Sequence, residues 1–202
     1  TNEEPIHGTK AKTETNANIA VIGAGWWSQG WHLPSLHNNQ RCNLVAIVDT
    51  SPHPKSNLNP DLEPLTTLAQ KYQTRIYSST EELLEDTKLC STLDGVIIAT
   101  PHATHFETFA FITTEHNFRR SNVNGDFKLK PLHVLMEKPM STDVHHALDL
   151  HCNVTMTSFD LSNSQFWVNH SANHRPQTKL ARDCIQSGRL GRIRHVTAYF
   201  AS

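Results

Sequence analysis

Short, unbroken apolar runs recur along this chain and restrict the folds that it can adopt. The runs lack the polar and apolar alternation of a strand with one face in water, so each is expected to form a strand buried on both faces. Such strands belong to parallel sheets whose faces are covered by helices. The predicted strands are 18–22, 44–48, 95–99 and 132–136, with shorter ones over 75–77 and 165–168.

Helix signals fall between these strands. Ser79 precedes Glu82, and Thr104 precedes Glu107, at the spacing of a capping box. The expected helices are 26–36, 65–72, a helix from Ser79, 104–116, 142–150 and 176–186. The proline-rich segment 51–64 and the polar, basic segment 117–131 are expected to be exposed loops. Alternating strands and helices predict an α/β fold with a right-handed, doubly wound parallel sheet.

The composition excludes several classes of function. Lys and Arg number 18 against 19 for Asp and Glu, a net charge of -1, so neither nucleic acid nor a membrane is an expected partner. The four cysteines are far apart, which argues against a disulfide framework or a zinc ribbon. No apolar run approaches the roughly 20 residues that span a bilayer. We therefore expect a cytoplasmic protein. The histidine pairs His102/His105 and His170/His174 lack neighbouring carboxylate or cysteine ligands, so no metal site is expected.

A glycine-rich segment stands between the first predicted strand and the first predicted helix. It reads Gly23-Ala24-Gly25-Trp26-Trp27-Ser28, in the context that a dinucleotide-binding fingerprint requires. Gly23 would permit the tight turn, and Gly25 would let the backbone approach a pyrophosphate held by amide groups and the helix dipole. Ser28 takes the third glycine position, where a small side chain is needed for close helix packing. A glycine turn in some other α/β protein is the alternative.

Asp49 ends the second predicted strand, where an acidic side chain accepts hydrogen bonds from the adenosine ribose hydroxyls. A carboxylate there favours NAD over NADP, because it would repel the 2′-phosphate. His53 and Lys55 follow closely and could accept a phosphate, so NADP stays open. The alternative for Asp49 is an acidic residue that only begins a loop.

Lys138 follows the strand expected over 132–136, within the tripeptide Glu137-Lys138-Pro139. Ligands of an open parallel sheet lie beyond the carboxyl ends of its strands, so this amine is expected at the cofactor. Burial and a nearby positive charge would favour the neutral amine, which could act as a general base. The alternative is a solvated loop lysine.

These motifs, in this order, resemble the Gfo/Idh/MocA oxidoreductase family. The likeness includes Gly23-Ala24-Gly25, Asp49, the segment 99–105 and Glu137-Lys138-Pro139, and continues through Asn169, Arg175-Pro176 and the segment 187–191. The resemblance implies that Thr100, Pro101 and His105 line the cofactor cleft, that Glu137 and Lys138 lie near the nicotinamide, and that the Lys138-Pro139 bond can be cis. The predicted cofactor-binding set is Gly23, Ala24, Gly25, Trp26, Trp27, Ser28, Asp49, Thr100, Pro101, His105, Glu137, Lys138 and Pro139.

The resemblance also implies an activity. We expect hydride transfer between NAD, or alternatively NADP, and a sugar- or polyol-like alcohol or carbonyl. Lys138 is the predicted catalytic residue, which accepts or relays the hydroxyl proton. Two alternatives stay open: a non-catalytic NAD(P)-binding regulator on the same fold, and an inactive fragment that only binds dinucleotide.

The expected domain organisation follows from the same motifs. Residues 1–17 are expected to be a disordered tail, 18–170 a dinucleotide-binding Rossmann domain, and 171–202 the crossover helix and first strand of a truncated α+β second domain. The chain begins without methionine and stops just after a strand-like run over 195–200, so we expect a fragment. A second acid or base and the homo-oligomer interface would then belong to the full-length protein.

Overall fold

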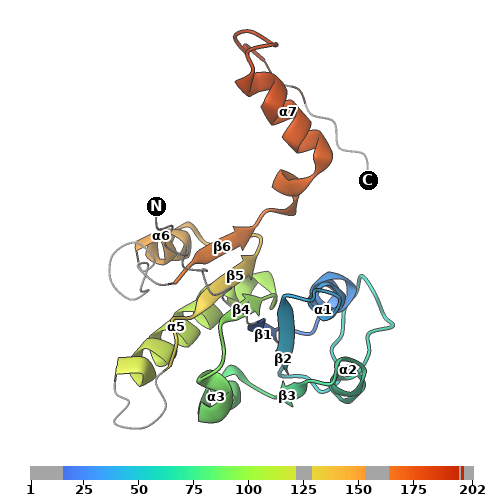
Figure 1. The fold of residues 1–202 in the computed structure, drawn as a ribbon, viewed down its shortest axis with the longest axis vertical. Helices are drawn as coiled ribbons and strands as arrows, with labels where there is room; N and C mark the ends of the chain where they lie inside the picture. The colour runs from blue at the N-terminus through green and yellow to red at the C-terminus, as the bar shows by residue number, and fades with distance from the viewer. Residues whose placement is uncertain (1–15, 122–128, 153–163, 196, 198–202) are drawn as a thin grey trace, which may run out of the picture.

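One six-stranded parallel sheet forms the centre of the computed structural model, which describes residues 16–121, 129–152, 164–195 and 197 (Figure 1). The strands are β1 (Ala17–Ile22), β2 (Cys42–Val48), β3 (Arg75–Tyr77), β4 (Gly95–Ile98), β5 (His133–Glu137) and β6 (Phe166–Asn169). Their order is β3-β2-β1-β4-β5-β6, and each described pair is parallel. The sheet therefore grows in one direction from β1 to β3 and in the other from β4 to β6, which confirms the predicted doubly wound α/β fold.

Helices cover both faces of this sheet. The described helices are η1, a π-helix (Ser28–His32), α1 (Leu33–His37), α2 (Leu65–Tyr72), α3 (Thr80–Glu85), α4 (Thr87–Cys90), the 3-10 helix η2 (His102–Thr104), α5 (His105–Ser121), α6 (Val144–Cys152), the 3-10 helix η4 (Ser171–His174) and α7 (Pro176–Gln186). In Figure 1, α7 lies beyond the end of β6, away from the other helices. Its exposed apolar side chains include Leu180 and Ile185.

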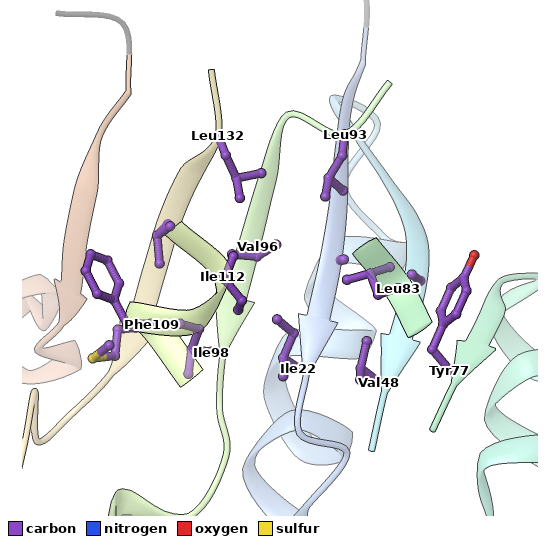
Figure 2. Close-up of a cluster of buried hydrophobic side chains, with 14 of the residues drawn as sticks. Ile22, Val48, Tyr77, Leu83, Leu93, Val96, Ile98, Phe109, Ile112 and Leu132 are labelled. Carbon is purple, nitrogen blue, oxygen red and sulfur yellow. The ribbon is translucent and has the colours of Figure 1, made fainter. Parts of the chain in front are cut away.

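Successive residues of the central strands enter opposite cores. Ile22 packs in the core made with α3, α5 and α6, whereas its neighbour Val21 packs in the core made with α1 and α2. Figure 2 shows the first of these cores, with Phe109 and Ile112 of α5 beside the strand residue Ile98. Burial of both strand faces explains the unbroken apolar runs in the sequence.

The exposed loop expected over 117–131 is wrong for part of the described residues, and residues 122–128 lie outside the described chain. Helix α5 continues through Ser121, and the Arg119 guanidinium donates to the carbonyl oxygen of Leu84 at 2.7 Å. Leu129 is 6% exposed and packs with Leu84 and Cys90. The basic composition of the segment did not predict that Arg119 binds a backbone carbonyl near the end of α3, or that Leu129 belongs to the core.

The two predicted capping boxes have different outcomes. The Ser79 hydroxyl accepts from the Glu82 amide at 3.1 Å, and α3 begins after it as expected. The Glu82 carboxylate accepts from the Ser78 amide rather than from the Ser79 amide of a complete capping box. Thr104 instead ends the short helix η2 and donates its hydroxyl to the Pro101 carbonyl oxygen at 2.9 Å. Helix α5 begins one residue later, at His105.

The boundaries expected at the chain ends are tested only in part. Ala17, assigned to the tail, pairs with Cys42 and belongs to β1, while residues 1–15 lie outside the described chain. The strand expected over 195–200 also falls mostly on residues outside it. Among the described residues, no helix has the length and hydrophobicity needed to cross a membrane.

Candidate functional site

A cleft of about 500 Å³ lies at the carboxyl ends of β1, β2 and β4. This is where the sheet changes its direction of growth, and where open α/β sheets bind their ligands. The predicted residues that line the cleft are Gly23, Gly25, Asp49, Thr100 and Pro101, and the lining also includes Lys55. The cleft and these six lining residues are called the dinucleotide end below.

Gly23 is a glycine because of the fold. Its φ is +95°, in the left-handed region, and a Cβ would lie 2.5 Å from the carbonyl oxygen of Ala99. Its amide N–H donates to the carbonyl oxygen of Val48 at 2.8 Å. The turn after β1 is thereby packed between the ends of β2 and β4, which explains why this position needs a glycine with or without a ligand.

Gly25 has no such structural reason. Its φ lies outside the left-handed region, and no described heavy atom lies within 4 Å of the position that its Cβ would occupy. It lines the cleft immediately before the first helical turn, where backbone amides and the helix dipole attract anions. A glycine that protein packing does not demand, facing open space at this place, fits the close approach of a phosphate group.

Ala24 and Ser28 act inside the turn. Ala24 is fully buried and donates its amide N–H to Asp49 Oδ2 at 2.7 Å, so it does not line the cleft. Ser28 is also fully buried, and its hydroxyl donates to the Gly23 carbonyl oxygen. Ser28 therefore does more than keep the helix close, because its hydroxyl also ties the π-helix η1 to the glycine turn.

Asp49 lies half-buried beyond the end of β2 and faces the cleft. Its Oδ2 accepts from the Ala24 amide and its Oδ1 accepts from the Ser51 amide at 2.9 Å. Each carboxylate oxygen has a further lone pair, so both can still accept a hydroxyl donor. The two amides fix the orientation of the carboxylate in the cleft.

Thr100 and Pro101 continue from β4 along the opposite wall. The Thr100 hydroxyl oxygen is buried and has no hydrogen-bond partner among the described residues. Buried hydroxyls are normally bonded, so this group beside the cleft has unused hydrogen-bonding capacity.

His105 does not line the cleft, although the resemblance placed it there. Its side chain is fully buried at the start of α5. Nδ1 lies 2.7 Å from the Pro139 carbonyl oxygen and Nε2 lies 2.9 Å from the Thr100 carbonyl oxygen. The imidazole stands behind the turn that forms the wall, and sequence position alone could not show which way it points.

Glu137 is also absent from the cleft lining. It is 6% exposed, and its Oε1 accepts from Trp27 Nε1 at 2.7 Å, His32 Nε2 at 2.8 Å and Asn169 Nδ2 at 2.7 Å. Burial raises the pKa of the carboxyl, but the hydrogen bonds from His32, Asn169 and Trp27 outweigh it and lower the pKa to about 2. Glu137 thus joins η1 to the ends of β5 and β6 as an ionised, buried acceptor.

Lys138 follows this buried carboxylate but is itself exposed. Its amide N–H donates to Glu137 Oε2 at 3.3 Å, and its peptide bond to Pro139 is cis, as the resemblance allowed. The described residues leave Lys138 exposed, so they do not themselves supply the burial expected from the sequence. Glu137, Lys138 and Trp27 together are called the lysine end below.

Three tryptophans form a cluster that includes Trp27 of the lysine end. Trp27 and Trp31 stack with ring centroids 5.0 Å apart, and Trp26 meets both at 5.6 Å and 5.9 Å. Trp31 is 51% exposed, and none of the three lines the cleft. The π-helical turn η1 brings them together, and sequence reasoning missed both the turn and the role of Trp27 as a donor to Glu137.

Comparison with known proteins identifies the family. Residues 17–155 match the model of GFO_IDH_MocA, described as an oxidoreductase family with an NAD-binding Rossmann fold. The chain belongs to the Gfo/Idh/MocA oxidoreductase family. The sequence-based family assignment is therefore confirmed.

Three of the proteins that the chain resembles are dehydrogenases by name. The chain is 21% identical over 179 residues to D-xylose 1-dehydrogenase [NADP(+)] of Haloarcula marismortui, covering 89% of this chain and 41% of that protein. Scyllo-inositol dehydrogenase from Lactobacillus casei, solved with NAD(H) and scyllo-inositol, matches with a TM-score of 0.66 at 14% identity, covering 88% of this chain and 43% of that one. WlbA dehydrogenase from Bordetella pertussis, solved with NADH and UDP-GlcNAcA, gives 0.64 at 21% identity, with 90% and 43% covered. The chain thus spans less than half the length of these Gfo/Idh/MocA relatives.

Proposed function

We propose that this protein is an NAD(P)-dependent dehydrogenase or reductase that acts on a sugar- or polyol-like alcohol or carbonyl. The observation that carries the proposal is the open space at Gly25, on the cleft at the carboxyl ends of β1, β2 and β4. The names of the related dehydrogenases support the substrate class.

The residues present fit a dinucleotide. The first helical turn after Gly25 would hold the pyrophosphate through backbone amides, and Thr100 lines the same cleft. Asp49 would accept from the adenosine ribose hydroxyls with the lone pairs that Ala24 and Ser51 leave free. When bound, the nicotinamide supplies the hydride acceptor or donor.

We further propose that NAD is preferred over NADP. The Asp49 carboxylate faces the cleft and would repel a 2′-phosphate, whereas Lys55 on the same lining would attract it. Asp49 is held in place by two backbone amides, so its negative charge cannot turn away easily. The related enzyme from Haloarcula marismortui is named for NADP, so cofactor choice varies among similar proteins.

Lys138 is the proposed acid–base residue. Oxidation of an alcohol carbon releases a hydride and the hydroxyl proton, and a neutral Lys138 amine would accept that proton. In reduction the ammonium would return the proton to the carbonyl oxygen. The amine is exposed among the described residues, and a bound substrate beside it would supply the burial that favours its neutral form.

Binding and turnover test this proposal separately. NADH fluorescence titrations should give saturable binding to the purified protein, and Gly25→Ala should abolish or strongly weaken it. A turnover screen with NAD or NADP and a panel of sugars and polyols should detect absorbance change that Lys138→Ala removes while NADH binding persists. No saturable binding of either cofactor would contradict the dinucleotide site, and unchanged turnover in Lys138→Ala would contradict the role of the lysine.

A non-catalytic NAD(P)-binding regulator, or a fragment that only binds dinucleotide, is the second candidate. The exposure of Lys138 favours it, because the described residues provide the cofactor cleft more completely than the acid–base environment. Saturable NADH binding without turnover across the substrate panel would support this candidate. A cytoplasmic location and homo-oligomerisation of a longer form stay predictions.

A further inference from the structure

We propose that His105 is a positioning residue that connects the two ends of the site. Its buried imidazole would hold the turn that carries Lys138 by contacting the Pro139 carbonyl oxygen. The same ring would hold the cleft wall by contacting the Thr100 carbonyl oxygen. The effect on turnover rests on the proposed function, but the geometric role does not.

The parallel ladder between β4 and β5 stops before it reaches the functional turns. Its last pair is Ile98 with Met136, whereas Thr100 and Pro139 lie two and three residues farther on. Beyond the ladder, the two backbones need another connection to keep a fixed separation. The His105 ring is placed between them and contacts a carbonyl oxygen from each.

The burial of His105 removes its ring from water, so the ring nitrogens depend on these two contacts. The ring is fully buried, although residues 101–104 immediately before it are all exposed. A buried carbonyl oxygen that loses its donor is destabilised, because no solvent replaces the hydrogen bond. The chain has thus turned the only buried side chain of the segment 101–105 toward two backbone acceptors.

Rigid ring geometry gives this contact its positioning value. Nδ1 and Nε2 are fixed in one plane, so the carbonyl oxygens of Pro139 and Thr100 are held at 2.7 Å and 2.9 Å from known points on one group. A carbonyl oxygen only accepts, so a neutral ring donates to one of the two oxygens, and both contacts are hydrogen bonds at the same time only when both ring nitrogens carry protons. The shorter contact joins Nδ1 to the carbonyl oxygen of Pro139, the residue directly after Lys138.

Two amide variants separate the contacts. The side-chain nitrogen of Asn reaches the place of Nδ1, and that of Gln reaches the place of Nε2. His105→Asn should therefore keep the Pro139 bond and lose the Thr100 bond, whereas His105→Gln should do the reverse. His102→Asn is the matched control, because His102 is an exposed neighbour whose ring lies 5.7 Å from that of His105.

The readouts are the NMR signal of isotope-labelled Lys138, assigned with Lys138→Arg, and the dissociation constant for NADH. His105→Gln should change the chemical shift of the Lys138 signal. The affinity of this variant for NADH should stay near that of the wild type. His105→Asn should keep the Lys138 signal and weaken NADH binding. In the turnover assay, His105→Gln should lower kcat by about 10²-fold with little change in KM, the effect expected when a reacting group is misplaced.

The proposal is overturned if His105→Gln leaves the Lys138 signal where it is in the wild type. The Lys138 signal is measured without cofactor, so this result does not depend on whether the protein binds NADH or turns over a substrate. If both variants fail to fold, isotope-labelled histidine in the wild type decides. A slowly exchanging Nδ1–H of His105 supports the proposal, and its absence contradicts it.

Discussion

The dinucleotide end and the lysine end are built from the same sheet but differ in what surrounds them. At the dinucleotide end, residues at and beyond the carboxyl ends of β1, β2 and β4 line a cleft of about 500 Å³. At the lysine end, the buried support is equally specific, with Oε1 of Glu137 accepting three side-chain hydrogen bonds, yet Lys138 above it is exposed. The described chain therefore supplies a cleft and a hydrogen-bonded support beneath Lys138, but leaves Lys138 itself exposed.

The largest expected effect is on the free energy of unfolding, at Gly23 in the turn of the dinucleotide end. Gly23→Ala puts a Cβ 2.5 Å from the Ala99 carbonyl oxygen at a φ of +95°. We expect a loss of about 3 kcal/mol or more in the free energy of unfolding. Urea denaturation followed by circular dichroism measures it.

Gly30→Ala is the matched control, because no described atom lies within 4 Å of its Cβ position and its φ lies outside the left-handed region. It should keep or slightly raise stability. Equal stability of Gly23→Ala and Gly30→Ala would show that the glycine turn is not packed as described.

The next largest effect concerns the buried support of the lysine end. The pKa of Glu137 is lowered from 4.5 to about 2, so its ionised form stabilises the fold by about 3 kcal/mol above pH 4.5. That contribution should be lost as the pH falls from 4.5 toward 2. Urea denaturation of Glu137→Gln and wild type across this range measures the difference.

The exposed carboxylate of Glu85 provides a control on the same protein. Glu85→Gln should differ little from wild type at any pH in the series. A stability gap between wild type and Glu137→Gln that does not narrow in acid would contradict the assigned ionisation.

These two regions also show how far sequence reasoning reaches. The unbroken apolar runs predicted the central strands because both sheet faces are buried, and the glycine turn was recognised from its place between a strand and a helix. The partners of Glu137 could not be predicted, because Trp27, His32 and Asn169 lie 110, 105 and 32 residues away in sequence. The inward turn of His105 depends on the same kind of long-range packing, as does the burial of Leu129.

A smaller effect sharpens the view that the dinucleotide end is ready to bind. Gly25→Ala adds a methyl group to open space, so the free energy of unfolding should stay within about 1 kcal/mol of wild type. NADH affinity should nevertheless fall at least about tenfold, a binding loss of about 1.4 kcal/mol. Fluorescence titration and urea denaturation of the same samples separate the two quantities. Unchanged NADH affinity would remove Gly25 from the site.

The smallest effect concerns cofactor choice within the cleft. Asp49→Ala should narrow the ratio of NADPH to NADH dissociation constants by about tenfold, or about 1.4 kcal/mol, because it removes the charge that repels a 2′-phosphate. Lys55→Ala should widen the ratio, since Lys55 lines the same cleft with the opposite charge. Equal losses for both cofactors in Asp49→Ala would contradict a role in discrimination.

The tryptophan cluster gives this protein a built-in optical reporter. Three of its four tryptophans lie in the cluster beside Glu137, and the fourth, Trp167, lies in β6. The close stacking of Trp27 and Trp31 should couple their electronic transitions and give a distinct near-ultraviolet circular dichroism signal. A reduced nicotinamide bound nearby would quench the indole emission by energy transfer, so the unlabelled chain can report both its own packing and the arrival of a ligand.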